Sequence, residues 1–221
     1  MAAIIRTEDL QKVFGRHVRA LDGVSLSVEE GEYVTVTGRS GSGKSTLMNI
    51  IGCLDQPTGG TVEIAGQRVN YSDPGQLVSL RRSKIGFIFQ QFSLIPSMTA
   101  AENIEYPLIF SGVPGAERKR RTMEMLELVG IRDRSDHLPG ELSGGQQQRV
   151  AISRALVAGP ELVLADEPTG NLDSTTSNEI ISLLKRINEE MGTTFLIVTH
   201  EPSIWLGTDR TIHLSDGKVV Q

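Results

Sequence analysis

The stretch GRSGSGKST, which spans residues 38–46, decides the fold. It matches the pattern GxxxxGK[ST], follows an apolar segment at 33–37 that predicts a strand, and opens a segment at 44–54 that predicts a helix. Between a strand and a helix, such glycines let successive backbone N–H groups face a phosphate, and the helix N-terminus adds partial positive charge. We therefore expect an α/β protein that binds a nucleotide at this loop.

The side chains of this loop have distinct expected roles. Lys44 is expected to reach the β- and γ-phosphates of the nucleotide, and Ser45 is expected to ligate Mg²⁺. Kinases, GTPases and many ATPases share such a loop, and a surface turn before a lysine is the structural alternative. The residues expected to contact the nucleotide here are Gly38, Arg39, Ser40, Gly41, Ser42, Gly43, Lys44, Ser45 and Thr46.

Two carboxylates follow a second apolar segment. Residues 162–165 read LVLA and predict a buried strand, and Asp166 and Glu167 come directly after it. A carboxylate at this place holds Mg²⁺ in P-loop ATPases, so Asp166 is the expected metal residue. Glu167 would then orient or deprotonate the attacking water, because it would lie beside the γ-phosphate. A solvated loop is the alternative for an isolated Asp-Glu pair, and the loop at 38–46 argues against it.

Apolar strands alternate with amphipathic helices along the chain, which predicts a largely parallel sheet covered on both faces. We expect one domain over 1–221: a P-loop NTPase core at 1–90 and about 143–221 with an N-terminal antiparallel β subdomain, and an inserted helical subdomain at about 91–142. Strands are expected at 3–10, 21–28, 33–37, 61–64, 85–89, 162–165 and 194–199, and helices at 44–54, 76–83 and 174–191, with helical patterns between 92 and about 142.

Composition limits the classes of function. Of 221 residues, 38% are hydrophobic and 22% charged, as in an ordinary globular protein. The apolar runs fall far short of the roughly 20 residues of a membrane-spanning helix, and no secretory signal is visible, so we expect a cytoplasmic protein. A formal charge of -5 argues against nucleic-acid binding, and the basic run RKRR at 118–121 is expected on a solvated helix face. The single cysteine, Cys53, is expected to be buried.

A third motif narrows the class. Residues 142–156 read LSGGQQQRVAISRAL and closely resemble the signature of ABC ATPases. Ser143 suits a helix N-cap and the following glycines allow close backbone approach, so this is a second anion site; a well-capped helix start is the alternative. In the ABC family, the signature of one subunit contacts the γ-phosphate held by the other. The resemblance implies ATP, Mg²⁺, an ATP-dependent homodimer, and nucleotide contacts from Ser143, Gly144, Gly145 and Gln146.

The remaining family elements occur in order along the chain. Gln90 resembles the Q-loop glutamine, which would meet Mg²⁺ or the water. The run NLD at 171–173 resembles the D-loop, which implies a nucleotide contact from Asp173. His200 resembles the switch histidine, which would lie at the γ-phosphate beside Glu167. The resemblance thus implies a catalytic set of Glu167, His200, Lys44 and Gln90, and metal contacts from Ser45, Gln90 and Asp166.

Two positions depart from the usual family pattern. Phe14 stands where the family commonly has a Tyr that stacks on adenine; a phenyl ring can supply that face, and a core Phe is the rival interpretation. Arg39 lies where several relatives carry Pro or another residue, and its side chain is expected to point to solvent. We interpret the remaining histidines, His17, His137 and His213, as structural.

The resemblance also implies partners. The segment that starts at Gln91 and ends at Met98 resembles the surface that contacts a transmembrane permease subunit, which would hold the chain at the inner face of the membrane. The runs IIGCLDQPTGG and IGFIFQQFSLIPSMTAAENI resemble the branch serving lipoprotein release and macrolide or peptide export. A regulatory ATPase of the cell-division type fits the same motifs. The further alternatives are a soluble ABC protein acting on ribosomes or DNA, which usually joins two cassettes, and an unrelated P-loop kinase or GTPase.

Overall fold

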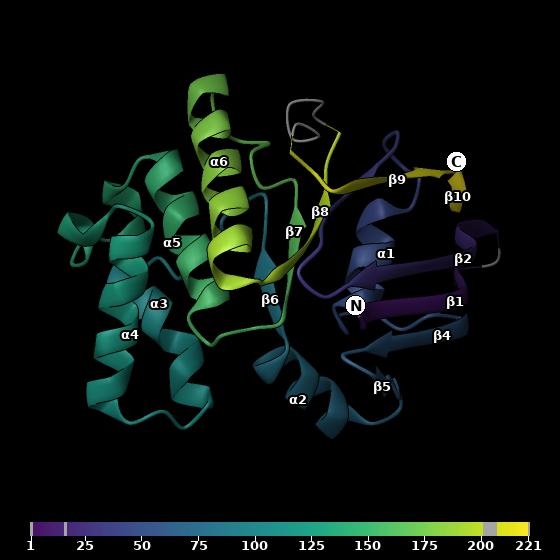
Figure 1. Cartoon of the computed structure of the whole chain (residues 1–221), viewed down its shortest axis with the longest axis horizontal. Helices are drawn as coiled ribbons and strands as arrows, with labels where there is room; N and C mark the ends of the chain where they lie inside the picture. Colours follow the sequence, from purple (N-terminus) through teal and green to yellow (C-terminus); the bar gives the residue numbers. More distant parts are fainter. Residues whose placement is uncertain (1, 16, 201–206, 221) are drawn as a thin grey trace.

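Two sheets of different kinds form the frame of the molecule (Figure 1). The computed structural model describes residues 2–15, 17–200 and 207–220. The antiparallel sheet has the order β2 (Val18–Glu29), β1 (Ala3–Phe14), β4 (Gly59–Ile64), β5 (Gln67–Arg68). The second sheet has the order β10 (Lys218–Val220), β9 (Arg210–Ser215), β3 (Tyr33–Thr37), β8 (Thr194–Val198), β7 (Leu162–Asp166), β6 (Ile85–Ile88), and only its β9–β10 pair is antiparallel. The predicted fold class is confirmed.

Helices cover both faces of the second sheet (Figure 1). Among the described residues, no helix combines the length and the hydropathy needed to cross a bilayer. α5 packs against α3 and α4 of the predicted helical subdomain and also against α6 of the predicted core. The predicted boundary near residue 142 between core and helical subdomain therefore stays a prediction. The helices are α1 (Lys44–Ile51), α2 (Pro74–Ser83), α3 (Ala100–Phe110), α4 (Gly115–Leu128), α5 (Gly144–Leu156) and α6 (Ser174–Met191), with 3-10 turns at Arg132–Arg134 and Pro139–Glu141.

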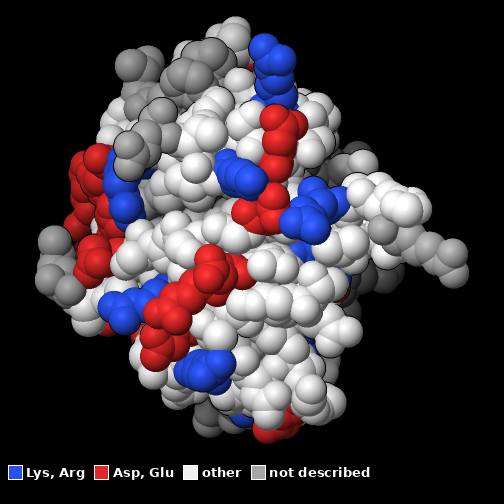
Figure 2. Space-filling view, turned by 90° about the vertical axis from the view of Figure 1, so that its right-hand side faces the viewer, with Lys and Arg blue, Asp and Glu red and all other residues white. Residues whose placement is uncertain are grey.

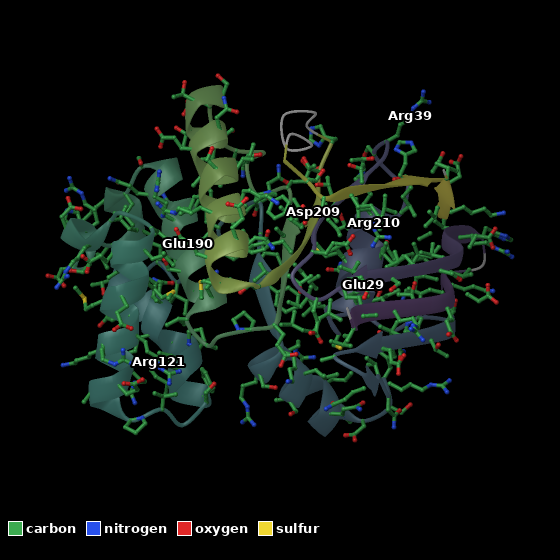
Figure 3. The ribbon with its side chains drawn as sticks, in the orientation of Figure 1. Glu29, Arg39, Arg121, Glu190, Asp209 and Arg210 are labelled. Carbon is green, nitrogen blue, oxygen red and sulfur yellow. The ribbon has the colours of Figure 1, made fainter. Side chains whose placement is uncertain are left out.

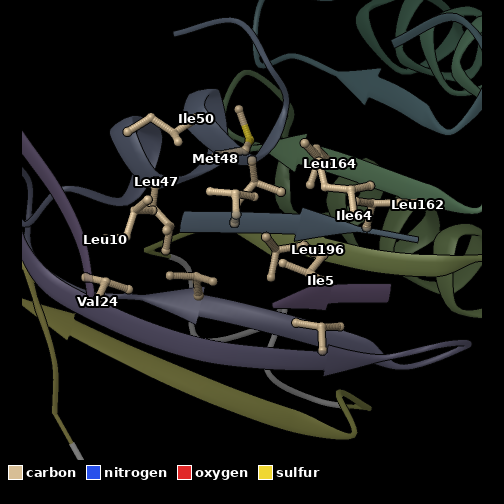
Figure 4. Close-up of a cluster of buried hydrophobic side chains, with 14 of the residues drawn as sticks. Ile5, Leu10, Val24, Leu47, Met48, Ile50, Ile64, Leu162, Leu164 and Leu196 are labelled. Atoms are coloured by element: carbon tan, nitrogen blue, oxygen red, sulfur yellow. The ribbon is translucent and has the colours of Figure 1, made fainter. Parts of the chain in front are cut away.

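The hydrophobic core has two parts, one on each face of the parallel sheet. Every residue of β3 and β8 is buried, which explains their continuous apolar and β-branched sequences. One cluster joins the antiparallel sheet, α1 and one face of the parallel sheet, through side chains such as Ile5, Leu47 and Leu164 (Figure 4). The other cluster joins the opposite face to the helices α3 to α6. The parallel sheet is therefore held rigidly from both sides.

Several element boundaries differ from those predicted. The helix expected at 44–54 ends at Ile51, because Gly52 closes it and Cys53 adopts a left-handed φ of 56°. Residues 92–99 are not helical, since Phe92 and Ser93 also have positive φ values, of 57° and 50°. β1 and β2 run longer than expected, and β5, β9 and β10 were not predicted. Only Ile212 and Leu214 of β9 are buried, so its apolar pattern is too short to stand out.

The local signals for helix ends and charge are borne out. Gly192 closes α6 with φ 66°, and Ser143 caps α5. The basic run in α4 is neutralised by carboxylates: Arg120 and Arg121 both donate to Glu117 and lower its pKa to about 2. On the face opposite α3 and α4, basic and acidic side chains lie interspersed (Figure 2). Each arginine of the basic run at 118–121 therefore pairs with a carboxylate.

Candidate nucleotide-binding site

The carboxyl ends of the parallel strands carry the candidate site. The phosphate loop follows β3, Gln90 lies shortly after β6, Glu167 directly follows β7, and His200 lies just beyond β8. Parallel strands place these ends on one edge of the sheet. There they surround a cavity of about 520 Å³ lined by Ala20, Gly38, Arg39, Ser40, Gly41, Gly43, Lys44, Ser45, Thr46, Gln90, Glu167 and His200.

The phosphate loop has a backbone that only glycine allows at its last turn. Gly43 has φ 104°, and a Cβ there would lie 2.3 Å from the carbonyl oxygen of Ala20 on β2. α1 then begins without a side-chain cap, so no side chain competes with an anion at its N-terminus. The Lys44 ammonium bridges the carbonyls of Gly38 at 2.8 Å and Arg39 at 3.0 Å. The loop thus presents an ammonium group and an uncapped helix start, both of which favour an anion.

Arg39 and Ser42 of the loop differ in exposure. The Arg39 side chain is exposed and extends outward from the loop, as predicted (Figure 3). Ser42 is 4% exposed and does not line the cavity, and its hydroxyl has no hydrogen-bond partner among the described residues. The predicted nucleotide contact of Ser42 therefore stays a prediction.

The predicted metal residues Ser45, Asp166 and Gln90 lie in or beside the cavity. The Ser45 hydroxyl is 3.5 Å from Asp166 Oδ1, and Gln90 lines the same cavity. Burial and the neighbouring Glu167 raise the pKa of Asp166, while Ser45 and Lys44 act in the opposite direction. Among the described residues, no cluster of three or more His, Cys, Asp or Glu could hold a metal alone. The donor set therefore fits Mg²⁺, which commonly takes few protein ligands beside phosphate oxygens and water.

Glu167 and His200 form a close pair. The Nδ1 atom of His200 lies 2.7 Å from the Glu167 carboxylate. Glu167 has a left-handed φ of 47°, and its backbone N–H donates to the carbonyl of Val198 at 2.8 Å. Such a conformation costs on the order of 1–3 kcal/mol for a non-glycine residue and persists only where surrounding contacts hold it. The carboxylate is thus fixed at the edge of the cavity by backbone and imidazole contacts.

The remaining predicted residues lie outside the cavity lining. At the start of α5, the N–H of Ser143 donates to Gln146 Oε1 at 2.9 Å and the N–H of Gln146 donates to Ser143 Oγ at 3.3 Å, which forms a capping box. Asp173 caps α6 by accepting from the backbone of Thr175 and Thr176, and hydrogen bonds from Thr176 lower its pKa. In one chain the signature, Ser143, Gly144, Gly145 and Gln146, therefore forms a surface of its own, apart from the cavity.

The Q-loop and the D-loop are joined directly. The side-chain amide of Asn171 donates to the carbonyl of Gln90 at 2.9 Å. A Cβ at Gly170 would lie 2.7 Å from Gln90 Nε2, so the Gln90 side chain packs onto the backbone of this glycine. A hydrogen bond and a packing contact therefore link the two loops.

Phe14 ends β1 and is 44% exposed, which excludes the interpretation as a core residue. The ammonium of Lys12 lies 4.9 Å from the centroid of its ring and also donates to Asp55 Oδ1 at 2.7 Å. Lys12 thus fixes the ring from one side. Ala20, which lines the cavity, was missed because nothing in its sequence context marks it.

Comparisons with known proteins agree with this geometry. A family model described as ABC transporter matches residues 21–170. The chain is 49% identical to an uncharacterized ABC transporter ATP-binding protein of Thermotoga maritima, over 99% of this chain and 94% of that protein. It is 47% identical to the macrolide export ATP-binding/permease protein MacB of Hyphomonas neptunium, over 98% of this chain but 34% of that protein, so it spans only a minor part of that relative's length.

Solved structures extend the likeness to three dimensions. The dimeric structure of a post-hydrolysis state of the ATP-binding cassette MJ0796 bound to ADP and Pi matches with a TM-score of 0.89 at 47% identity, covering 98% of this chain and 97% of that chain. The protein MJ0796 of Methanocaldococcus jannaschii is an uncharacterized ABC transporter ATP-binding protein, and it is 52% identical over 91% of this chain.

Proposed function

This chain is an ATPase of the ABC transporter family, and from that premise we propose that it drives export or extraction of a substrate through a separate membrane subunit, by ATP-dependent closure of a homodimer. The observation that carries the proposal is the convergence of Lys44, Gln90, Glu167 and His200 on one cavity at the strand ends. The family match also removes the kinase and GTPase alternatives.

The residues in and beside the cavity have separate roles in ATP hydrolysis. Lys44 binds the β- and γ-phosphates, and Ser45 and Asp166, with Gln90, would hold Mg²⁺. When bound, Mg²⁺ neutralises charge on the phosphate oxygens. Glu167 orients the attacking water and accepts its proton, and His200, 2.7 Å away, holds the carboxylate and faces the γ-phosphate. Phe14 supplies an exposed aromatic face for adenine, while Lys12 occupies the other side of the ring.

The signature surface fits a contact between two copies of the chain. Ser143 to Gln146 lie outside the cavity of their own chain, yet they form a helix start at which backbone N–H groups attract an anion. Placed against a second copy, this surface would meet the γ-phosphate held there by Lys44. Asp173 caps the neighbouring helix α6 and would meet the nucleotide at the same interface. ATP would thereby join two chains, and hydrolysis would release them.

The membrane partner would dock beside the Q-loop. A groove of about 200 Å³ between α2, β6, α3 and α5 is lined by Phe87, Phe89 and Pro107 together with two arginines. One of them, Arg154, donates to the carbonyls of Phe92 and Ser93 and so fixes the segment that starts at Gln91 and ends at Met98. A permease seated here would act on Gln90 directly and would hold the chain peripherally at the inner face of the membrane.

The test of the catalytic roles is Glu167→Gln. We expect ATP turnover to fall by about 10²-fold or more, because the general base is lost, and an ATP-bound dimer to accumulate in size-exclusion chromatography. Glu161→Gln is the matched control, since Glu161 stands before the opposite end of β7 and pairs with Lys84. Undiminished hydrolysis by Glu167→Gln, or no increase of dimer with ATP, would contradict the catalytic roles proposed above.

A second experiment separates transport from a regulatory role. Macrolide export belongs to relatives such as MacB, whose length this chain only partly covers. The membrane protein that co-purifies with the tagged chain should be reconstituted with it in vesicles, and substrate movement should be measured with ATP and with Glu167→Gln. Substrate movement that needs ATP and Glu167 supports export or extraction. ATP turnover stimulated by the partner without any movement would favour the regulatory alternative of the cell-division type.

A further inference from the structure

A buried amide on α5 serves no role assigned so far. Gln148 is 0% exposed and lies on the face of α5 that also carries Ile152 and Ala155, at spacings of a helical core stripe. Its Nε2 donates to the carbonyl of Pro168 at 2.6 Å. Its Oε1 has no hydrogen-bond partner in the part of the chain that the structure describes.

The acceptor of this hydrogen bond belongs to the turn that carries the catalytic carboxylate. Pro168 follows Glu167 directly and is itself buried. The Glu167 backbone is held on one side by its N–H bond to Val198 of β8, and the turn is closed by the N–H of Gly170, which donates to the Glu167 carbonyl at 3.1 Å. Gln148 holds the following peptide from the opposite side. The left-handed conformation of Glu167 is therefore fixed from both β8 and α5.

The donor of this hydrogen bond belongs to the helix that the signature begins. Gln148 lies within the first two turns after the N-cap Ser143, so the two residues move together with the helix. The same helix start packs closely against the D-loop side: a Cβ at Gly144 would lie 3.2 Å from Leu172, and one at Gly145 would lie 2.6 Å from Thr176. The helix that the signature begins is therefore connected to the Glu167 turn by a buried hydrogen bond.

Stability does not explain this amide. A buried polar group with only part of its hydrogen bonding satisfied is costly, whereas an apolar side chain of similar size packs in an apolar stripe without that cost. Gln148 lies on the same face as Ile152, on a helix whose other buried residues are mostly apolar. The hydrogen bond that its Nε2 does donate goes to the carbonyl of Pro168, next to Glu167.

We propose that Gln148 is a positioning residue that couples the signature to Glu167 of the same chain. When the signature engages the nucleotide held by a second copy, α5 would set the orientation of the Glu167 carboxylate at the nucleotide of its own phosphate loop. The two sites of the dimer would then be coupled within each chain through one hydrogen bond. The inference rests on the proposed ATPase dimer and deepens it by naming a path of regulation.

Gln148→Met tests this role, because methionine keeps the length and apolar packing but removes the donor. We expect kcat for ATP to fall by about 10- to 100-fold, as for a displaced catalytic group, while KM changes less than about twofold. Ser153→Ala is the matched control: Ser153 is also a fully buried polar residue of α5, but its hydroxyl meets the carbonyl of Met125 at 3.5 Å. It should change neither constant. If Gln148→Met does not fold, the same two constants are measured for Gln148→Asn, whose side chain is shorter and withdraws the amide from the Pro168 carbonyl.

A double-mutant cycle shows whether Gln148 acts through Glu167. In single-turnover assays, Gln148→Met should cause no further loss in the Glu167→Gln background, because its target is already inactive. An equal loss in both backgrounds, or wild-type kcat in Gln148→Met, would overturn the inference. Failure of the proposed function is seen separately, as absence of turnover by the wild-type chain or full turnover by Glu167→Gln.

Discussion

Two helices of this molecule begin at glycine-rich motifs, and their starts are built in opposite ways. At α1, Gly43 has φ 104° and no side chain caps the helix. At α5, Gly144 and Gly145 have ordinary helical backbone, and the side chains of Ser143 and Gln146 fill the cap. The first start has no side chain on its N–H groups, whereas at the second Ser143 occupies the N–H of Gln146 and leaves only the rest of the helix start open to an anion.

The glycines therefore serve different purposes in the two motifs. In the phosphate loop, glycine is required by backbone conformation and by the backbone of β2, since a Cβ at Gly43 would lie 2.3 Å from the Ala20 carbonyl oxygen. In the signature, glycine is required by a neighbouring side chain, since a Cβ at Gly145 would lie 2.6 Å from Thr176 Cγ2. A second substitution cannot remove the backbone carbonyl that Gly43 avoids, but it can remove the side-chain methyl group that Gly145 avoids.

The largest effect is expected from Gly43→Ala. The new Cβ would meet a carbonyl oxygen on β2 and force the positive φ onto alanine, so the loop must move. We expect the affinity for ATP to fall on the order of 100-fold, the equivalent of about 3 kcal/mol, in a fluorescent-nucleotide titration. Gly41→Ala should cost less, because its φ of 79° is also positive but nothing lies within 4 Å of a Cβ there. Equal losses in both variants would contradict the role of the β2 contact.

A smaller effect that can be rescued is expected from Gly145→Ala. The added methyl group would press on Thr176, whose hydroxyl is tied to Asp173 at 2.6 Å and cannot simply turn away. Such overpacking costs typically about 1–3 kcal/mol, and we expect ATP turnover to fall roughly tenfold with ATP binding to the single chain unchanged. Thr176→Ser removes the clashing methyl but keeps the hydroxyl, so the double variant should recover turnover. Without recovery, the glycine would be needed by the second copy and not by Thr176.

The contrast also explains which parts of the site the sequence could predict. The phosphate loop and the cap of α5 are local features, in which a few adjacent residues determine backbone and hydrogen bonding, and both were predicted. The pairing of Glu167 with His200 was implied by the resemblance of His200 to the switch histidine, and it agrees with the rule that ends of parallel strands meet at one edge. Contacts that depend on packing between distant elements were not predictable, such as the approach of Ala20 to Gly43.

The errors in the fold have the same physical origin. β9 has only Ile212 and Leu214 as buried hydrophobic residues, and it is a strand because β3 offers a free edge for parallel pairing. Gln148 has the sequence appearance of a surface residue among other glutamines, and only the position of Pro168 gives its amide an acceptor. Local pattern therefore predicts elements and motifs, whereas tertiary pairing decides edge strands and buried polar contacts.

A modest loss of stability is expected from Ser143→Ala. Removing an N-cap acceptor typically costs about 1 kcal/mol, and thermal unfolding should show a decrease in Tm of about 2–4 °C. Asp73→Ala is the control, since Asp73 caps α2, away from the cavity, by accepting from Gly75 and Gln76. Both variants should lose similar stability, but only Ser143→Ala should weaken the ATP-bound dimer of the Glu167→Gln chain. Similar dimers in both would mean that the signature cap has no part in closure.

The smallest effect concerns the far end of α1. Cys53 is 3% exposed, and burial raises the pKa of its thiol to about 11, so little thiolate is present at pH 8. We expect a thiol reagent to label the native chain about 100-fold more slowly than the denatured chain, and more quickly as the pH rises toward 11. ATP should leave this rate unchanged, because α1 is buried between the two sheets and its open N-terminus needs no rearrangement to accept phosphate. Faster labelling with ATP would show that α1 moves when the nucleotide binds. The start of α1 would then not be preformed for phosphate, and the contrast with the start of α5 would be lost.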